Sequence, residues 1–450
     1  MTSRPGLDDL RFAMDGILPY AREDLEELVG IPSISADPSR QTDVDRAASR
    51  VAEMASAAGA TEVRVVSASG APAVIASWPA PPGAPTVLLY AHLDVQPAGL
   101  EQEWTSPPFE PTERDGRLFG RGASDDKAGV VMHLAVLRSF AGHPPVGVVL
   151  FVEGEEEIGS PSLPALLAEH RDLLRSDVIV IADSVNATVD IPALTTSLRG
   201  FLDVVVEVRL LERLVHSGLY GGPVGDALTA LCRLLATLHD EHGAVTVPGL
   251  HVGSGDSLEL DEATFAAAAG LIPGALLLGS GTLAERLWHR PAVAVLGIDA
   301  PPVAEATPVL LARARALISL RLAPGDGAHR ALRALTKHLT SHAPWGAEVL
   351  VTEDAHGEPC TLETSGVVYD LAQASLAEAY GNRPFETGLG GSNSVVTELV
   401  RAYPDSAVLI TGVGDPASRW HGVDESLHLG MWGRACLAEA LLLLRLAPKP

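Results

Sequence analysis

The chain has 450 residues, enough for two or more domains that each bury a core. A hydrophobic content of 47% with 20% charged residues is typical of a globular protein and excludes global disorder. The formal net charge of -25, with no run of Lys and Arg, predicts that the chain binds neither nucleic acid nor an anionic membrane.

The N-terminal segment and the cysteines set further limits. The segment MTSRPGLDDLRFAMDG lacks the pattern of a signal peptide, and no stretch reaches the roughly 18 apolar residues of a membrane span, so we expect a soluble, cytoplasmic protein. Cys232, Cys360 and Cys436 are far apart and form no CxxC motif, which indicates neither a disulfide framework nor a zinc-thiolate site. Any metal would therefore be held by His and carboxylate side chains.

The first hundred residues combine helices with strands. Apolar residues at helical spacing predict helices over 21–29 and 43–60, the second ending at the stop signal Gly59. Strand-like runs follow over 62–66, 73–78 and 86–95. This order indicates an α/β domain, in which ligands collect at the carboxyl ends of the strands.

The third of these strands ends in two polar residues, His92 and Asp94. Alternation places both side chains on the same side of the extended chain, so the imidazole can bind a metal while the carboxylate orients its ring. A surface His beside a turn Asp is the alternative. The apolar run VLLY before them should be buried, which favours a functional partner for the polar tip.

A glycine-punctuated loop over 118–129, LFGRGASDDKAG, carries two adjacent carboxylates, Asp125 and Asp126, before a helix-like apolar run. Two divalent cations about 3.5–4 Å apart need a bridging carboxylate, and a strand-to-helix loop can present both of its oxygens. The loop could also be no more than a helix cap. The remainder of the chain decides between these readings.

Acidic residues follow two more apolar strands. After GVVLFV come Glu153, Glu155, Glu156 and Glu157, whose crowding costs electrostatic energy unless a cation or a shared proton relieves it. One of them can bind metal while a neighbour acts as general base. Asp183 closes the next apolar strand. Several strands that end in metal-type ligands make a metal site a more specific prediction than a solvated acidic turn.

From about residue 198 the pattern changes to a strand, an amphipathic helix, and later a second strand and helix before the closing strand AEVLVTED. This order suggests a smaller α/β sandwich inserted into the first domain and ending near residue 357. Residues 240–290 allow no firm assignment beyond a short helix at AAAAG. Helices and strands return over 362–449, where His421 lies in a loop between strand and helix.

Seven motifs occur here in the order seen in one family: HLDVQPAG, GRGASDDKAG, EGEEEIGS, the strand-end Asp183, HSGLYGGPVGDAL, SLRLAPG and WHGVDES. The chain thus resembles the metallopeptidase family of acetylornithine deacetylase, succinyl-diaminopimelate desuccinylase, glutamate carboxypeptidase and carnosinase-like dipeptidases. WTSPPFEP and RLWHRPAV make it most similar to the dipeptidase branch. The resemblance implies a mixed-sheet α/β/α catalytic domain (1–197 and 358–450) with an inserted ferredoxin-like lid and dimerisation domain (198–357).

The resemblance also implies roles for individual residues. Asp125 would bridge two divalent cations, with His92 and Asp183 completing one site and Glu157 and His421 the other. Glu156 would be the general base, Asp94 would orient His92, and the peptide bond after Asp125 would be cis. In the inserted domain, His216 would reach the active site of the partner subunit of a homodimer, and Arg321 would clamp the substrate carboxylate. Gly391 and Ser392 of the GLGGS loop are assigned to substrate binding.

These roles predict a metal-dependent dipeptidase that activates water with a metal and a glutamate base. Zinc suits mixed His and carboxylate ligation with an open position, although manganese or cobalt fits the same ligand types. An N-acyl amino-acid deacylase of the same family is the alternative, and a catalytically silent small-ligand binding protein a remote one. Two departures bear on the substrate: Asn393-Ser394 where the dipeptidase branch has Ile-Pro, and RLVHSG without the usual acid before His216.

Overall fold

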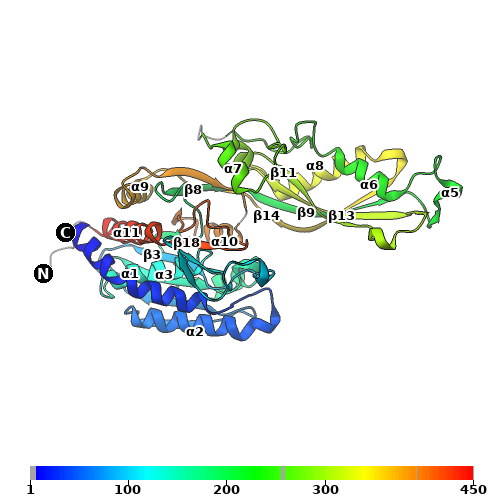
Figure 1. Cartoon of the computed structure of the whole chain (residues 1–450). Helices are drawn as coiled ribbons and strands as arrows, with labels where there is room; N and C mark the ends of the chain where they lie inside the picture. Colours follow the sequence, from blue (N-terminus) through cyan, green and yellow to red (C-terminus); the bar gives the residue numbers. More distant parts are fainter. Residues whose placement is uncertain (1–6, 255–258, 392, 449–450) are drawn as a thin grey trace. The chain divides into compact units, whose positions relative to one another are not determined.

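The computed structural model describes residues 7–254, 259–391 and 393–448 (Figure 1). The chain divides into two compact units. The first consists of Met1–Thr196, Leu362–Thr387 and Ser394–Pro450, and the second of Ser197–Thr361 and Gly388–Asn393. The division predicted from the sequence, at 197/198 and 357/358 with a lid and dimerisation role for the middle segment, stays a prediction.

The first unit contains α1 (Leu7–Val29), α2 (Gln41–Ala57), α3 (Lys127–Ser139), α4 (Leu163–Glu169), α9 (Val367–Tyr380), α10 (Ser394–Ala402) and α11 (Leu429–Leu446). The expectation that α1 begins near residue 21 was wrong, because the helix continues through Pro19. Proline ordinarily interrupts a helix. Burial of Leu10 and Met14 stabilises the part of the helix before residue 21 that the sequence pattern had left out.

A nine-stranded sheet forms the centre of this unit, in the order β1-β2-β6-β3-β7-β17-β8-β15 with β16 also paired to β8; its short edge strand β15 is the end of the segment Ser197–Thr361. Their bounds are β1 Glu62–Val66, β2 Ala73–Trp78, β3 Thr86–His92, β6 Gly147–Glu153, β7 Val178–Ile181, β8 Ala193–Leu198, β15 Cys360–Thr361, β16 Phe385–Leu389 and β17 Ala407–Ile410. Strands β6, β3, β7 and β17 run parallel, whereas β1, β2 and β8 pair antiparallel. The expected mixed sheet is thus confirmed, and the carboxyl ends of β6, β3 and β7 meet at one edge.

Apolar packing holds this edge in place. Strands β3, β6 and β7 are buried almost throughout, as expected of parallel strands covered on both faces. They share one hydrophobic core with α1, α2, α3, α9 and α11. A small sheet of β4 (Thr112–Arg114), β5 (Arg117–Phe119) and β18 (Ser426–His428) pairs the segment before the 118–129 loop with the segment after His421.

The second unit has a four-stranded antiparallel sheet in the order β11-β13-β9-β14. Its main elements, in chain order, are β9 (Gly200–Arg209), α6 (Ala227–Ala236), β11 (Ala292–Asp299), β13 (Arg313–Leu322), α8 (Ala328–Ser341) and β14 (Glu348–Gly357). This βαββαβ order gives the expected ferredoxin-like fold. Smaller elements are β10 (Val215–His216), α5 (Ser217–Tyr220), α7 (Glu262–Ala268) and β12 (Val309–Leu310).

The second unit also shows what the sequence pattern missed. Strand β11 was not predicted, because it is an edge strand whose side chains are mostly exposed and so lacks the alternation of a half-buried strand. The short helix expected at AAAAG is present as α7. Within the described ranges, no helix has both the length and the apolar character needed to span a membrane.

Candidate metal centre

Five elements of the first unit bring the predicted ligands to one edge of its sheet. His92 is the last residue of β3, and Asp183 follows β7 by two residues. Glu156 and Glu157 begin a short 3-10 helix after β6. Asp125 lies in the loop before α3. His421 lies nearly 300 positions after Asp125 and reaches it because β18, which follows His421, pairs with β5, which precedes Asp125.

Asp125 stands at the centre of the cluster. Its Oδ1 lies 3.2 Å from His92 Nε2, and its Oδ2 lies 3.0 Å from His421 Nε2. His421 Nε2 is also 3.1 Å from Glu157 Oε2. Cations bound at about 2.0–2.2 Å keep tetrahedral ligand atoms about 3.3–3.6 Å apart, so these spacings are close to those of a metal site.

Two ligand groups share Asp125. His92, Asp125 and Asp183 offer ligand atoms within 4.8 Å of one another, and so do Asp125, Glu157 and His421. We call the second group the His421 triad. Because each oxygen of Asp125 faces a different histidine, one carboxylate can serve both groups. This geometry is what a carboxylate bridging two cations requires.

The electrostatics of the cluster also fit a cation. Burial raises the pKa of Asp183 to about 7, and the nearby charges of Asp125 and Glu157 add to the shift. Burial likewise raises the pKa of Glu156 well above its ordinary value, with Asp183 and Asp125 contributing. Anionic groups held this close disfavour one another's ionisation unless a positive charge is present. A bound cation supplies that charge.

In the metal-free protein the two histidines supply the positive charge instead. Burial alone would raise the pKa of Asp125, but hydrogen bonds with His421 and His92 lower it well below its usual range. Hydrogen bonds with Asp125 and Glu157 raise the pKa of His421 to about 10. Burial works against protonation of His92, yet its bonds to Asp125 and Asp94 raise its pKa well above normal. The imidazolium groups thus hold the carboxylates together.

Asp94 contacts more of the site than the sequence predicted. His92 Nδ1 donates to the Asp94 carbonyl oxygen at 3.1 Å and lies 3.4 Å from the carboxylate. The carboxylate accepts hydrogen bonds from the backbone N–H groups of Glu156 (3.2 Å) and Glu157 (3.1 Å). The side chain therefore lies between the strand that carries His92 and the turn that carries the predicted base and a predicted ligand.

The two residues of the Asp125–Asp126 pair differ in environment. The peptide bond between them is cis, as the resemblance implied. Asp126 is fully buried and its Oδ2 accepts the His92 backbone N–H at 3.3 Å. Its neighbour Asp125 is the member that faces both histidines. The alternative that the acidic pair is only a helix cap fails, because Asp126 makes no side-chain cap bond to α3.

The remaining predicted residues belong to the second unit. His216 ends β10, and its Nδ1 accepts the Gly218 backbone N–H at 3.0 Å. Arg321 lies on β13, opposite Phe201 of β9, with its guanidinium carbon 6.0 Å from that ring. Gly391 follows β16, and Ser392 lies outside the described residues. The roles of these four residues stay predictions.

Sequence reasoning missed three residues that touch the site. Gln96 donates from its backbone N–H to Glu157 Oε1 (3.1 Å) and from its side chain to Glu157 Oε2 (3.0 Å). Arg121 and Glu425 form a buried ion pair of 2.6 Å beside the Asp125 loop. Gln96 lies in HLDVQPAG, Arg121 in GRGASDDKAG and Glu425 in WHGVDES. Their position inside these motifs could have marked the three residues as candidates. The sequence of a single chain does not show which residue each of them contacts.

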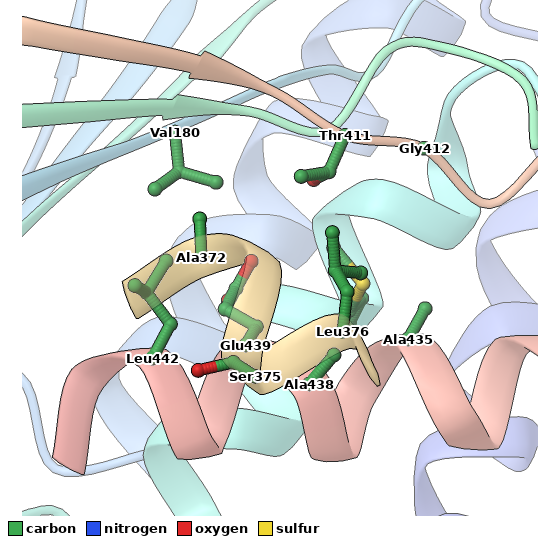
Figure 2. Close-up of a pocket in the computed structure, with 11 residues that line it drawn as sticks. Val180, Ala372, Ser375, Leu376, Thr411, Gly412, Ala435, Ala438, Glu439 and Leu442 are labelled. Carbon is green, nitrogen blue, oxygen red and sulfur yellow. The ribbon is translucent and has the colours of Figure 1, made fainter. Parts of the chain in front are cut away.

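A separate cavity of about 20 Å³ lies away from the cluster and has mostly apolar walls (Figure 2). Its polar groups include the carboxylate of Glu439, whose Oε1 is 2.8 Å from His133 Nδ1. His133 Nε2 is also 3.0 Å from the Tyr90 carbonyl oxygen. A cavity of this size has room for about one water molecule and none for a peptide. It is part of the core between α9, α11 and β7.

The protonated histidines predict how metal binding depends on pH. At pH 7 His421, with a pKa of about 10, carries a proton in the metal-free protein, and a ring nitrogen must lose its proton to bind metal. Binding should therefore release protons, and the apparent affinity should rise about tenfold per pH unit for each proton released as the pH increases from 7 towards 10.

Calorimetric titration of the metal-stripped protein, in two buffers with different ionisation enthalpies, measures this release. His421→Ala should release fewer protons than the unsubstituted protein. Equal heats in the two buffers would contradict the protonation state described here.

Comparison with known proteins shows the family of the chain. Residues 88–443 match Peptidase family M20/M25/M40. The chain is 38% identical to a cysteinylglycine-S-conjugate dipeptidase of Corynebacterium striatum over 370 residues, 80% of this chain and 81% of that protein. It is 27% identical to the Beta-Ala-His dipeptidase of Mus musculus over 376 residues, 79% of this chain and 76% of the other.

A solved structure resembles the fold along its whole length. The di-peptidase Dug1p from Saccharomyces cerevisiae superposes with a TM-score of 0.84 at 23% identity, covering 100% of both chains. At this identity the likeness concerns the fold. The extent of the family match and the 38% identity carry the assignment. The chain belongs to Peptidase family M20/M25/M40.

Proposed function

We propose that this chain is a metal-dependent dipeptidase that hydrolyses dipeptides with a free C-terminal carboxylate. The observation that carries the proposal is the pair of ligand groups sharing Asp125, with Glu156 Oε2 4.0 Å from His92 Nε2 beside them. Both relatives compared by sequence above are named as dipeptidases: one is a cysteinylglycine-S-conjugate dipeptidase and the other a Beta-Ala-His dipeptidase.

Five residues would hold two divalent cations, which we propose to be zinc. His92 and Asp183 would complete one position, Glu157 and His421 the other, and Asp125 would bridge them. When bound, such cations supply a water of lowered pKa and polarise the peptide carbonyl. Imidazole and carboxylate ligands suit zinc, and the same ligand types also accept manganese or cobalt.

Glu156 is proposed as the general base. Its raised pKa suits a group that accepts a proton from water near neutral pH and then delivers it to the leaving amine. Asp94 supports this task, because its carboxylate accepts the backbone N–H groups of Glu156 and Glu157 and so fixes the turn that presents both side chains. The protein groups thereby hold the base beside the ligand cluster before substrate arrives.

The second unit is proposed to supply the substrate contacts. Arg321 would clamp the C-terminal carboxylate, because a planar guanidinium binds a carboxylate through two hydrogen bonds. His216 would polarise the scissile carbonyl in the partner subunit of a homodimer, and Gly391 and Ser392 would line the substrate pocket. We also propose that the second unit closes as a lid when substrate binds, and that the protein is cytoplasmic.

Hydrolysis of a dipeptide panel beside the matched N-acetyl amino acids tests the proposed substrate class. We expect dipeptides to be cleaved and their C-terminally amidated forms to be resisted, since amidation removes the carboxylate that Arg321 would bind. Arg321→Lys should raise KM for dipeptides, because an ammonium group cannot make the paired contact.

Two outcomes would change the assignment. Cleavage of N-acetyl amino acids alone would replace the dipeptidase with the deacylase of the same family. Absence of any hydrolysis, with metal bound, would favour a silent binding protein.

A further inference from the structure

Glu425 is a fully buried carboxylate that holds the loop of Asp125. Its Oε1 accepts the backbone N–H groups of Ser124 at 3.0 Å and Asp125 at 3.1 Å. Its Oε2 accepts the N–H of Gly122 at 3.0 Å and Arg121 Nη1 at 2.6 Å. The donors of all four of these hydrogen bonds thus belong to the five-residue stretch that ends in Asp125.

Arg121 extends this arrangement to the other two members of the His421 triad. It is 1% exposed, and its Nη2 donates to the carbonyl oxygens of Gly422 at 3.1 Å and Pro97 at 3.4 Å. Gly422 directly follows His421. Pro97 directly follows Gln96, whose side chain donates to Glu157. The ion pair is therefore bonded to the backbone directly after His421 and directly after Gln96, the residue that holds Glu157.

A buried ion pair needs such additional bonds. Removing two charges from water is costly, and their attraction offsets this only when the geometry is good and the remaining hydrogen-bonding groups are satisfied. Three backbone donors on Glu425 and two backbone acceptors on the Arg121 Nη2 group supply most of these bonds, and only Arg121 Nε of the pair has no hydrogen-bond partner among the described residues. The pair is thus suited to fixing loops rather than to binding a ligand of its own.

We propose that Glu425 is a positioning residue for the metal bound by Asp125, Glu157 and His421. The inference rests on the proposed function, because it assumes that this triad holds a cation. His421 has a φ of +60°, a conformation that non-glycine residues rarely adopt, so its loop depends on surrounding contacts to stay in place. Glu425 lies four residues after His421, so loss of its charge weakens the bonds that join this segment to the Asp125 loop.

The test is the metal affinity of Glu425→Gln, measured by competition with a chromophoric chelator, with zinc as the probe. Gln keeps the size of the side chain but offers one acceptor oxygen and turns an NH₂ group towards backbone donors. Loss of an outer partner of metal ligands typically costs about 10–100-fold in metal affinity, and we expect a loss of this size for one of the two zinc ions. Glu425→Asp, which keeps the charge, should lose less.

Glu439→Gln is the matched control. Glu439 is also a buried Glu of the first unit (Figure 2), and its Oε1 lies 2.8 Å from Nδ1 of His133, which is on α3 and not in a ligand loop. Both Gln variants should unfold at lower temperature than the parent, and only Glu425→Gln should lose zinc affinity. All titrations are made on protein whose circular dichroism matches the parent, and Arg121→Lys stands in if Glu425→Gln does not fold.

Three results separate the possibilities. Parental zinc affinity in Glu425→Gln overturns the positioning role. Equal loss of affinity in Glu439→Gln does so too, because it would trace the effect to general destabilisation. If the parent binds two zinc ions but hydrolyses no dipeptide, the proposed function fails while the affinity comparison still decides the role of Glu425.

Discussion

Glu156→Gln is expected to lower kcat for dipeptide hydrolysis by about 10²–10⁴-fold, the usual contribution of a general base. The amide has nearly the same shape but cannot accept the proton of a water molecule. KM and bound metal should change little, because Glu156 belongs to neither ligand group. Steady-state kinetics with metal analysis on the same preparation measures both effects.

The pH profile of the same variant gives a second readout. In the parent, the pKa of Glu156 is raised by burial and by neighbouring carboxylates, so kcat/KM should fall as the pH drops and the base becomes protonated. That acid limb should be lost or displaced in Glu156→Gln. A variant that keeps parental kcat would remove Glu156 from the mechanism, whatever its position.

Asp125→Asn should have a larger effect, since Asp125 is the residue shared by both ligand groups. Each carboxylate oxygen faces a different histidine, and an amide offers only one oxygen and no charge. We expect weaker binding of both metals and a kcat/KM below that of Glu156→Gln. Metal content by mass spectrometry after dialysis against a weak chelator, together with kcat/KM, measures the loss.

Asp126→Asn is the neighbouring control for Asp125→Asn. The Asp126 side chain is buried and accepts the His92 backbone N–H through one oxygen, a contact that an amide oxygen can keep. Metal content should therefore stay near that of the parent. If Asp125→Asn retained two tightly bound metals, the bridging role proposed for Asp125 would be wrong.

The sequence allowed the ligand cluster to be predicted because strand ends have a physical meaning. A run of buried apolar residues that stops at His92 or just before Asp183 places a polar side chain at the carboxyl end of a strand. In a parallel sheet those ends meet, and ligands bind there. The structure brings these residues together with Asp125. The apolar pattern alone was therefore enough to predict that His92 and Asp183 lie at the carboxyl ends of β3 and β7.

The contacts that support the cluster were not readable in this way. Glu425 binds backbone N–H groups about 300 residues earlier in the chain, and any side chain at positions 122, 124 and 125 offers the same N–H group. Periodicity carries no information about such bonds. The same limit applies to Gln96, whose partner Glu157 lies 61 residues away. Only the folded chain identifies them.

Two errors in the predicted elements have simple physical origins. Helix α1 begins at Leu7 because burial of Leu10 and Met14 outweighs the local effect of Pro19. Strand β11 was missed because an exposed edge strand has no buried face to impose alternation. The roles proposed for His216 and Arg321 are a separate matter. They follow from the family resemblance and not from any pattern in the chain, and they stay predictions.

The most direct test of the central claim is the return of metal to the stripped protein. One sample would be titrated with zinc, and bound zinc and dipeptide hydrolysis would be followed together. We predict no hydrolysis in the stripped protein, activity that rises with zinc bound at the Asp125 cluster, and no such rise in Asp125→Asn. Hydrolysis by the stripped protein, or full activity in Asp125→Asn, would contradict a metal-dependent peptidase centred on Asp125.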